Sequence, residues 1–186
     1  MIPEIRKKFN NGFSEKVYQE FLDDLNSVFK YPTDFRVCET PLFLSHELTS
    51  ELVKACDDVI VQLLQEEFLK RSENAVPIHL NVPNDSEHPH FLQLDFAITN
   101  NGEKFLPKLI ELQAFPSLYG YQSYLNDVIR KHFDIPVGFH SQFNGLNKAA
   151  YKTLLANTIL GNHDPENVIL LEIEPEKQKT RIDFAA

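Results

Sequence analysis

Hydrophobic residues recur every three or four positions along much of the N-terminal half of the chain. This spacing predicts an amphipathic helix over residues 14–30, with Ser14 as its N-cap. A longer run of apolar residues at the same spacing predicts a second helix that begins near residue 46 or 50 and continues to residue 72. Residues 74–90 are rich in Pro, Asn and Asp, and we therefore expect a loop there.

The pattern changes to alternation in the middle of the chain, which is typical of strands with one buried face. The segment FLQLDFAIT, residues 91–99, alternates apolar side chains with polar or small ones, and LPKLIELQAF, residues 106–115, repeats this design. Between them lies Asn101-Gly102, a dipeptide that favours tight turns. We therefore predict an antiparallel hairpin.

The C-terminal third predicts two further helices and one further strand. Residues 117–133 form one helix with Ser117 as its N-cap, and residues 145–161 form the other, closed by Gly161. The run NVILLEIEP, residues 167–175, is expected to be a buried strand. The last three residues resemble the first turn of a helix, so we expect a piece of a longer chain. A disordered polar tail at a true C-terminus is the alternative.

These elements predict an α+β fold. It has a helical N-terminal half, an antiparallel hairpin flanked by helices, and a further buried strand. The chain is expected to be a single domain over residues 1–186, or the N-terminal fragment of a longer protein. An approximate subdivision separates a helical part, residues 1–75, from a hairpin, helix and strand part, residues 76–186.

Composition and charge exclude several classes of protein. Hydrophobic residues make up 42% and charged residues 24% of the chain, as in ordinary globular domains. The net charge of −9 disfavours nucleic acid as a partner, because binding phosphates requires clustered Lys and Arg. Cys38 and Cys56 have no metal-type spacing, and no signal peptide opens the chain, so we expect a cytoplasmic protein. The apolar runs are too short to cross a membrane, which is therefore not an expected partner.

The register of the hairpin decides whether Asp95 and Glu111 share a face. A two-residue turn at Asn101-Gly102 would send the two carboxylates to opposite faces. A longer loop centred near Glu103 would place Asp95 opposite Glu111 and Gln93 opposite Gln113, with Cβ atoms about 5 Å apart. Pro107 favours the longer loop, because proline cannot donate a ladder hydrogen bond where such a loop closes.

In that longer-loop register two carboxylates and two amides lie together on one face of the sheet. Opposed carboxylates repel each other unless a cation binds between them or the pKa of one is raised so that it becomes protonated. Magnesium takes one or two carboxylates together with other oxygen ligands, and Asp95, Glu111 and the Gln113 carbonyl fit this preference. The alternative is a set of solvated side chains on the wet face of a hairpin.

The block QLDFAITNNGEKFLPKLIELQAFPSLYG, residues 93–120, resembles a motif of ATP-grasp ligases. The motif reads Arg-x-Asp, then Glu-x-Asn, then Pro. Its early position resembles the circularly permuted branch that includes glutathionylspermidine synthase, and VILLEIEPEKQKTRIDF, residues 168–184, is a weaker echo of the same proteins. The resemblance implies a partial ATP-grasp-like architecture with Asp95, Glu111 and Gln113 as Mg²⁺ ligands and ATP as cofactor. Gln93 stands at the position of the family's catalytic Arg.

The resemblance implies that the parent chain is an enzyme, an ATP-dependent carboxylate-amine ligase that forms an acyl-phosphate. Its partners would be a small carboxylate, a small amine and the remainder of the parent chain. The family's phosphate-binding lysines would lie after residue 186, so the isolated chain is expected to be inactive. Two alternatives stay open: a non-catalytic ATP-grasp relative that binds a ligand or protein, favoured by Gln93, and an unrelated soluble interaction domain, favoured by the tight turn register.

Three other groups of residues carry weaker hypotheses. Ser117 and the helix that follows it could hold an anionic cofactor group through backbone N–H groups, with simple capping as the alternative. The histidines of the central loop could bind a metal or lie on the surface; they are His79, His88 and His90. The aromatic residues around the turn could line a cleft or belong to the core; they are Phe115, Tyr119, Tyr121 and Tyr124.

Overall fold

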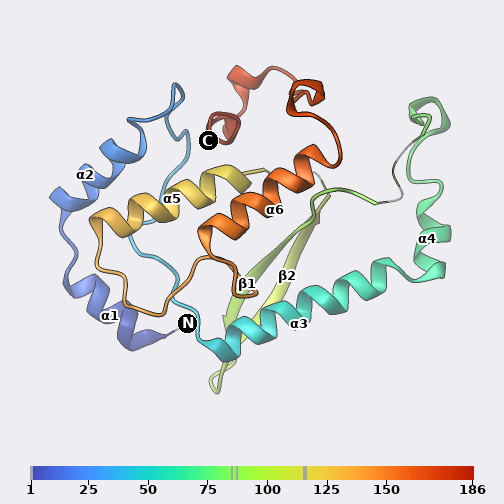
Figure 1. The fold of residues 1–186 in the computed structure, drawn as a ribbon. Coiled ribbons are helices and arrows are strands. Elements are labelled where there is room, and N and C mark those ends of the chain that lie inside the picture. Colours follow the sequence, from blue (N-terminus) through green and yellow to red (C-terminus); the bar gives the residue numbers. More distant parts are fainter. Residues whose placement is uncertain (1, 85, 87, 115–116) are drawn as a thin grey trace. The chain divides into compact units, whose positions relative to one another are not determined.

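A computed structural model describes residues 2–84, 86, 88–114 and 117–186 (Figure 1). Within these residues the fold has six α-helices and a two-stranded antiparallel sheet, so the predicted α+β class and the antiparallel hairpin are confirmed. Residues 44–114 with residue 2 form one compact unit, which we call the hairpin unit. Pro3–Phe43 and Ser117–Ala186 form a second, the helical unit. This grouping does not follow a division at residue 75, because helices from both ends of the chain share one core.

The hairpin unit consists of α3 (His46–Leu63), α4 (Glu66–Ser72), a 3₁₀ turn (Ile78–Leu80), β1 (Gln93–Asn100) and β2 (Phe105–Gln113). Helix α3 begins where the hydroxyl of Ser45 accepts a hydrogen bond from the Leu48 N–H at 3.2 Å, which satisfies one of the free donors of the first turn. The Leu48 side chain is buried, and α3 packs against β2 (Figure 1). The helix therefore supports the strand that carries Glu111 and Gln113.

The prediction of one continuous helix up to residue 72 is wrong. Helix α3 ends at Leu63, and Gln65 adopts an extended backbone conformation before α4 begins at Glu66. The apolar stripe of α3 is buried or half-buried, but apolar side chains at and after the end of α3 are exposed, among them Val61 and Leu64, with 58% and 68% of their surfaces exposed. The helix breaks where this burial ends, because most helical stability in proteins comes from packing of the apolar face.

The N-terminal part of the helical unit contains α1 (Pro3–Asn11) and α2 (Glu15–Leu25). Helix α1 was not expected from the sequence, although Pro3 occupies the first helical position, where its missing N–H has no cost. Ser14 caps α2 as predicted, through its hydroxyl and the Val17 N–H. The helix ends earlier than residue 30, because the Asn26 side chain binds the Leu22 carbonyl and the Thr33 N–H.

The C-terminal part of the helical unit contains α5 (Tyr119–His132) and α6 (Lys148–Leu160), followed by short 3₁₀ turns, the last of which is Arg181–Phe184. Gly161 closes α6 with a positive φ of 57°, as its predicted role requires. Helices α2 and α5 pack side by side (Figure 1), and the last turn packs on α5. Their shared core is made of buried side chains from all three segments: Phe21, Leu25, Tyr121, Val128 and Ile182.

The predicted buried strand over residues 167–175 is wrong. Residues 168–174 form neither a helix nor a strand, and the two ends of the predicted segment, Asn167 and Pro175, belong to 3₁₀ turns. Their apolar side chains are exposed to solvent, with Ile169 at 84% and Leu171 at 85%. The amino acids of this segment favour a strand, but a strand also needs a neighbour for its backbone, and the described residues supply none.

Asp24 forms the main ion pair between α2 and α5. Its Oδ2 lies 2.7 Å from the Lys131 Nζ and 2.8 Å from the His132 Nε2. These hydrogen bonds, that of Lys131 first, hold the pKa of the Asp24 carboxyl below its ordinary value. Because the folded pKa is lowered, the carboxylate stabilises the fold above its unfolded pKa, and this contribution is lost as the pH falls through the folded pKa.

We expect Asp24→Asn to lower the free energy of unfolding at pH 7 by about 1 kcal/mol or less, since Lys131 is exposed. Between about pH 5 and pH 3 the variant should lose less stability than the parent protein. Urea unfolding followed by circular dichroism at several pH values measures both effects. Asp23→Asn is the matched control, because the Asp23 side chain is exposed and, in the part of the chain that the structure describes, accepts a hydrogen bond from Gln19 on its own helix and forms no ion pair. Parallel acid profiles for the parent and Asp24→Asn would contradict this role.

Candidate functional site

A four-residue loop, residues 101–104, joins the two strands of the hairpin. The Asn100 side chain accepts a hydrogen bond from the Gly102 N–H, and the Asn101 side chain accepts from Glu103 and Lys104. Gly102 has a φ of 94°, a conformation that favours glycine. The loop therefore matches neither the two-residue turn nor the longer loop centred near Glu103, the two alternatives predicted from the sequence.

A β-bulge sets the register at the candidate site. From Asn100↔Phe105 to Phe96↔Leu109 the paired residue numbers sum to 205, which on its own would place Asp95 opposite Ile110. Ile110 has no partner, and the ladder resumes with Asp95↔Glu111. The predicted pairing of Asp95 with Glu111 is confirmed, but the bulge produces it and the loop does not.

The rest of the predicted pairing follows from the same shift. Gln93 lies opposite Gln113, as the sequence analysis predicts. Pro107, expected where a wide loop closes, lies inside the ladder opposite Ile98. A proline is tolerated there because both strands of a two-stranded sheet are edge strands.

Hydrogen bonds join the four polar side chains at this end of the hairpin. The Gln113 amide nitrogen lies 2.6 Å from the Glu111 Oε1 and 3.4 Å from the Asp95 Oδ2. The Gln93 amide donates to the Asp95 Oδ1 at 2.9 Å. Asp95 and the two glutamines are half-buried, whereas Glu111 is exposed. The four side chains thus converge, with both carboxylates bound to amide hydrogens.

Charge balance distinguishes this cluster from an ordinary surface hairpin. Within the described residues neither Asp95 nor Glu111 forms an ion pair with a basic side chain. Two neighbouring carboxylates are therefore held together by neutral amides alone, an arrangement that a cation would stabilise. In the described part of the chain no three His, Cys, Asp or Glu side chains gather as a metal site, so a cation here would need amide or other oxygens as well.

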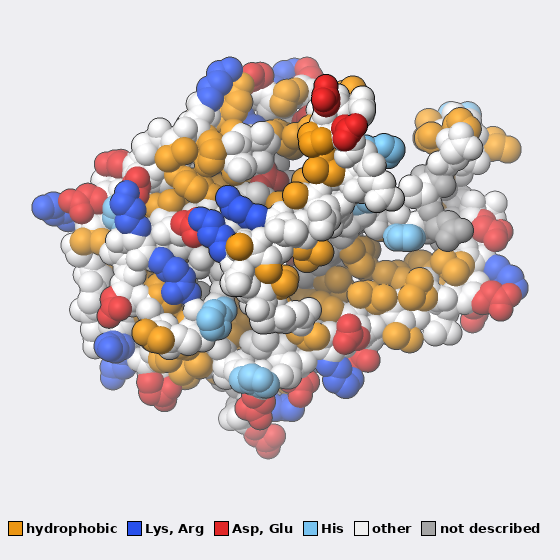
Figure 2. Space-filling model, in the orientation of Figure 1, with side chains coloured by type: hydrophobic (Ala, Val, Ile, Leu, Met, Phe, Trp, Pro, Cys, Tyr) orange, Lys and Arg blue, Asp and Glu red, His pale blue; other side chains and the backbone are white. Residues whose placement is uncertain are grey.

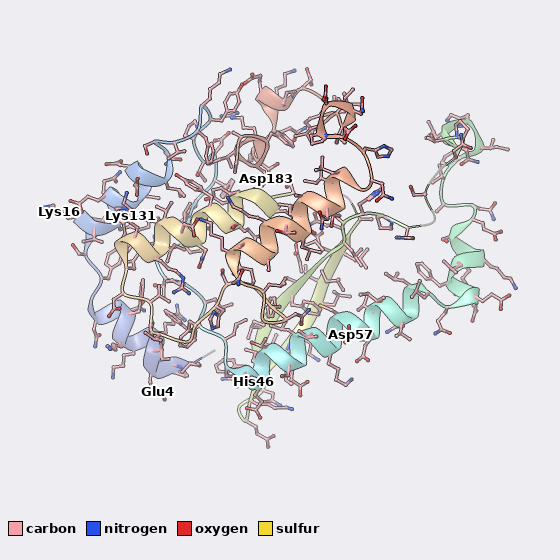
Figure 3. All side chains as sticks on the ribbon, viewed as in Figure 1. Glu4, Lys16, His46, Asp57, Lys131 and Asp183 are labelled. Atoms are coloured by element: carbon pink, nitrogen blue, oxygen red, sulfur yellow. The ribbon has the colours of Figure 1, made fainter. Side chains whose placement is uncertain are left out.

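The structure places Ser117 next to a helix terminus that is already capped. Leu118, with a φ of 75°, is the N-cap of α5, so the prediction that Ser117 fills this position is wrong. The Asp183 carboxylate accepts hydrogen bonds from the Leu118 N–H at 2.6 Å and from the Tyr121 N–H at 2.8 Å. Figure 3 shows Asp183 beside the first turn of α5. These two donors are therefore not available to a cofactor anion.

Asp183 is the residue near the proposed sites that sequence reasoning missed. It lies 65 residues after Leu118 along the chain, and nothing in the local sequence links the two. Its carboxylate takes the place that an external anion would occupy at a helix N-terminus, where partial positive charge favours an acid. The Asp183 carboxylate also lies close to Gly120, where a Cβ would be 3.4 Å from Oδ1, an ordinary van der Waals distance.

The remaining candidates do not converge on a site. His79, His88 and His90 are exposed and do not belong to a metal cluster among the described residues. Of the aromatic group, Tyr121 is buried in the core of the helical unit, while Phe115 lies outside the described residues. For Tyr121 the interpretation as a core residue is therefore confirmed.

Comparisons with known proteins add no identification. No protein-family model, no curated protein and no solved structure matches this chain. None of the helices in the described part of the chain has both the length and the apolar character that a membrane span requires. The hairpin, with its paired carboxylates, is therefore the feature of this chain that points to a function.

Proposed function

We propose that this chain supplies the magnesium-binding part of the Mg-ATP site of an ATP-grasp-like carboxylate-amine ligase. The observation that carries the proposal is the direct pairing of Asp95 with Glu111, with Gln113 in contact with both. Asp95 and Glu111 would hold the ion. The rest of the nucleotide site would come from the remainder of a parent chain, whose substrates would be a small carboxylate and a small amine.

The donor set of the cluster fits magnesium. Carboxylate and amide oxygens are hard ligands, and Mg²⁺ is commonly held by one or two carboxylates while water and phosphate complete its shell. The Gln113 side chain can turn its carbonyl oxygen toward the ion by rotating its terminal amide, because the two ends of the amide have similar size and shape. When bound, the ion would neutralise charge on the nucleotide phosphates.

A non-catalytic ATP-grasp relative is the second candidate, and Gln93 favours it. Phosphoryl transfer depends mainly on positive charge placed around the transferring group, and Gln93 stands where the family has Arg. In the structure its amide donates to Asp95. Such a protein would bind the nucleotide or another ligand without turnover. The interaction-domain alternative was favoured by a tight Asn101-Gly102 register, which the hairpin does not adopt.

Binding of Mn²⁺ as a substitute for Mg²⁺ tests the site in the chain as it stands. We expect Asp95→Asn and Glu111→Gln each to weaken Mn²⁺ binding by ~10-fold or more, because each removes a charged ligand but preserves side-chain shape. Electron paramagnetic resonance of free Mn²⁺ during titration measures this affinity. Glu103→Gln is the matched control, because Glu103 lies in the loop of the same hairpin, outside the cluster. Equal affinity for all four proteins would overturn the proposed ligands.

Nucleotide turnover distinguishes the two candidate functions. In a longer chain that carries this sequence, the ligase proposal expects ATP hydrolysis that depends on Mg²⁺ and is abolished by Glu111→Ala. The non-catalytic candidate expects ATP binding without hydrolysis. Hydrolysis that survives Glu111→Ala would remove this residue from the mechanism, whatever the Mn²⁺ titration shows.

A further inference from the structure

Lys108 lies on the same face of the hairpin as the carboxylate and amide cluster. It pairs with Ala97, and directly opposed residues of an antiparallel ladder share a face. Ala97 follows Asp95 by two positions on β1, so these two residues also point to the same side. The Cβ atom of Lys108 is therefore a diagonal neighbour of the Asp95 Cβ atom, about 7–8 Å away.

The β-bulge is what brings Lys108 to this face. Lys108 and Glu111 are three positions apart on β2, and in a regular strand such residues point to opposite sides. Ile110 is the extra residue of the bulge, so the alternation is reset and both Lys108 and Glu111 share a face with Asp95. The alternating pattern of the sequence would assign Lys108 to the other face.

The lysines and arginines of the hairpin unit fall into two groups. Lys54, Lys70 and Arg71 each form an ion pair within α3 or α4, and Figure 2 shows acidic and basic side chains next to one another over these helices. Lys104 and Lys108, on the hairpin, form no ion pair within the residues that the structure describes. Lys108 is also exposed, so its ammonium group is free to meet an anion.

We propose that Lys108 binds a phosphate group of a polyphosphate ligand whose other oxygens bind the metal ion at Asp95 and Glu111. This inference rests on the proposed magnesium site. Two carboxylates balance the charge of one dication, so a bound polyphosphate keeps its negative charge unless the protein adds a cation. Lys108 is the one basic residue of β1 and β2, and a lysine ammonium is a common phosphate ligand in proteins.

The neighbouring side chains on this face agree with that role. Ala97, the residue opposite Lys108, carries only a methyl group, so no large side chain on β1 separates Lys108 from Asp95. Gln93 is neutral, and its amide donates to the Asp95 Oδ1 at 2.9 Å. The face thus offers two carboxylates to a metal ion and one ammonium group to an anion. This combination selects a metal-bound polyphosphate, because either part alone would leave one sign of charge unbalanced.

Isothermal titration calorimetry with inorganic triphosphate in excess Mg²⁺ tests the contact in the chain as it stands. We expect Lys108→Met to weaken triphosphate binding ~10-fold or more, because it removes a charge-assisted hydrogen bond but keeps a long side chain. Lys108→Arg should retain an affinity within ~3-fold of the parent, because it keeps the positive charge. Lys104→Met is the matched control, since Lys104 is an exposed lysine in the loop, about 20 Å from Asp95 along the strands.

The affinity for Mn²⁺, measured by electron paramagnetic resonance, separates this inference from the proposed metal site. Lys108→Met should bind Mn²⁺ at least as tightly as the parent, because it removes a positive charge beside the carboxylates. If the parent bound Mn²⁺ but no triphosphate, or if Lys104→Met and Lys108→Met bound triphosphate equally well, Lys108 would be an ordinary solvated side chain. The inference would then be overturned while the metal site stood. A parent chain that binds no Mn²⁺ would overturn both.

The rate of lysine acetylation tests the contact directly. Bound magnesium triphosphate should slow the acetylation of Lys108 ~5-fold or more, because phosphate covers its ammonium group, and should leave the rate at Lys104 unchanged. Peptide mapping by mass spectrometry measures both rates in the same sample, with Mg²⁺ alone as the reference. Equal protection of the two lysines would show a general effect of the polyanion on the reagent and would exclude a specific contact at Lys108.

Discussion

Replacing Ile182 with alanine is expected to lower the free energy of unfolding of the helical unit by about 2–5 kcal/mol. Ile182 is completely buried in the last 3₁₀ turn and packs into the core formed by α2 and α5. Truncation removes buried apolar surface and leaves a cavity that the surrounding helices close only in part. Urea unfolding followed by circular dichroism measures the change.

The control for this prediction is Ile159→Ala on α6. The Ile159 side chain is half exposed, so the same truncation should change stability by about 1 kcal/mol or less. The comparison isolates burial, because the residue type and the lost atoms are identical. If Ile182→Ala were no more destabilising than Ile159→Ala, the C-terminal turn would not be part of the core.

Replacing Asp183 with alanine is expected to destabilise the helical unit by about 2 kcal/mol. The substitution leaves the N–H groups of Leu118 and Tyr121 without their carboxylate acceptor and removes a negative charge from the positive end of α5. Asp183→Asn keeps one acceptor oxygen and should have an intermediate effect. Urea unfolding gives the stability, and hydrogen exchange of the two amides reports the loss directly.

Asp164→Ala is the matched control for the Asp183 variants. Asp164 is an exposed acid that precedes a short 3₁₀ turn and makes no capping bond with its side chain. We expect Asp164→Ala to change the free energy of unfolding little and to leave the hydrogen exchange of the Leu118 and Tyr121 amides unchanged. Protection of these amides that survives Asp183→Ala would show that Asp183 does not cap α5.

In the helices, the periodic pattern of apolar residues predicts some boundaries correctly and others wrongly. Ser14 and Gly161 were identified correctly, because the residues that cap a helix act on groups only a few positions away. The end of α2 was predicted too late, because it depends on Asn26, whose side chain binds Thr33 in the following loop. A helix end that depends on a contact with a later loop cannot be predicted from the spacing of apolar residues.

In the hairpin, too, the sequence predicts some features of the candidate site and not others. Alternation predicts both strands and the shared face of Glu111 with Gln113, because successive residues of a strand point to opposite sides. The loop length and the bulge at Ile110 were not predicted, although their combined effect gave the expected pairing. Two errors in the local geometry cancelled, so the correct register does not show that the turn was understood.

The sequence by itself determined the types of most elements, the presence of the hairpin and the chemistry of the carboxylate and amide cluster. These features depend on side-chain spacing and on the groups that each residue carries. Only the tertiary structure decided that Asp183 caps α5 and that Ile182 completes the core, because both contacts join residues far apart in the chain. Only the tertiary structure also showed that Val168–Ile173 is not a buried strand. Strand propensity belongs to a segment, whereas a strand exists only where another backbone meets its hydrogen bonds.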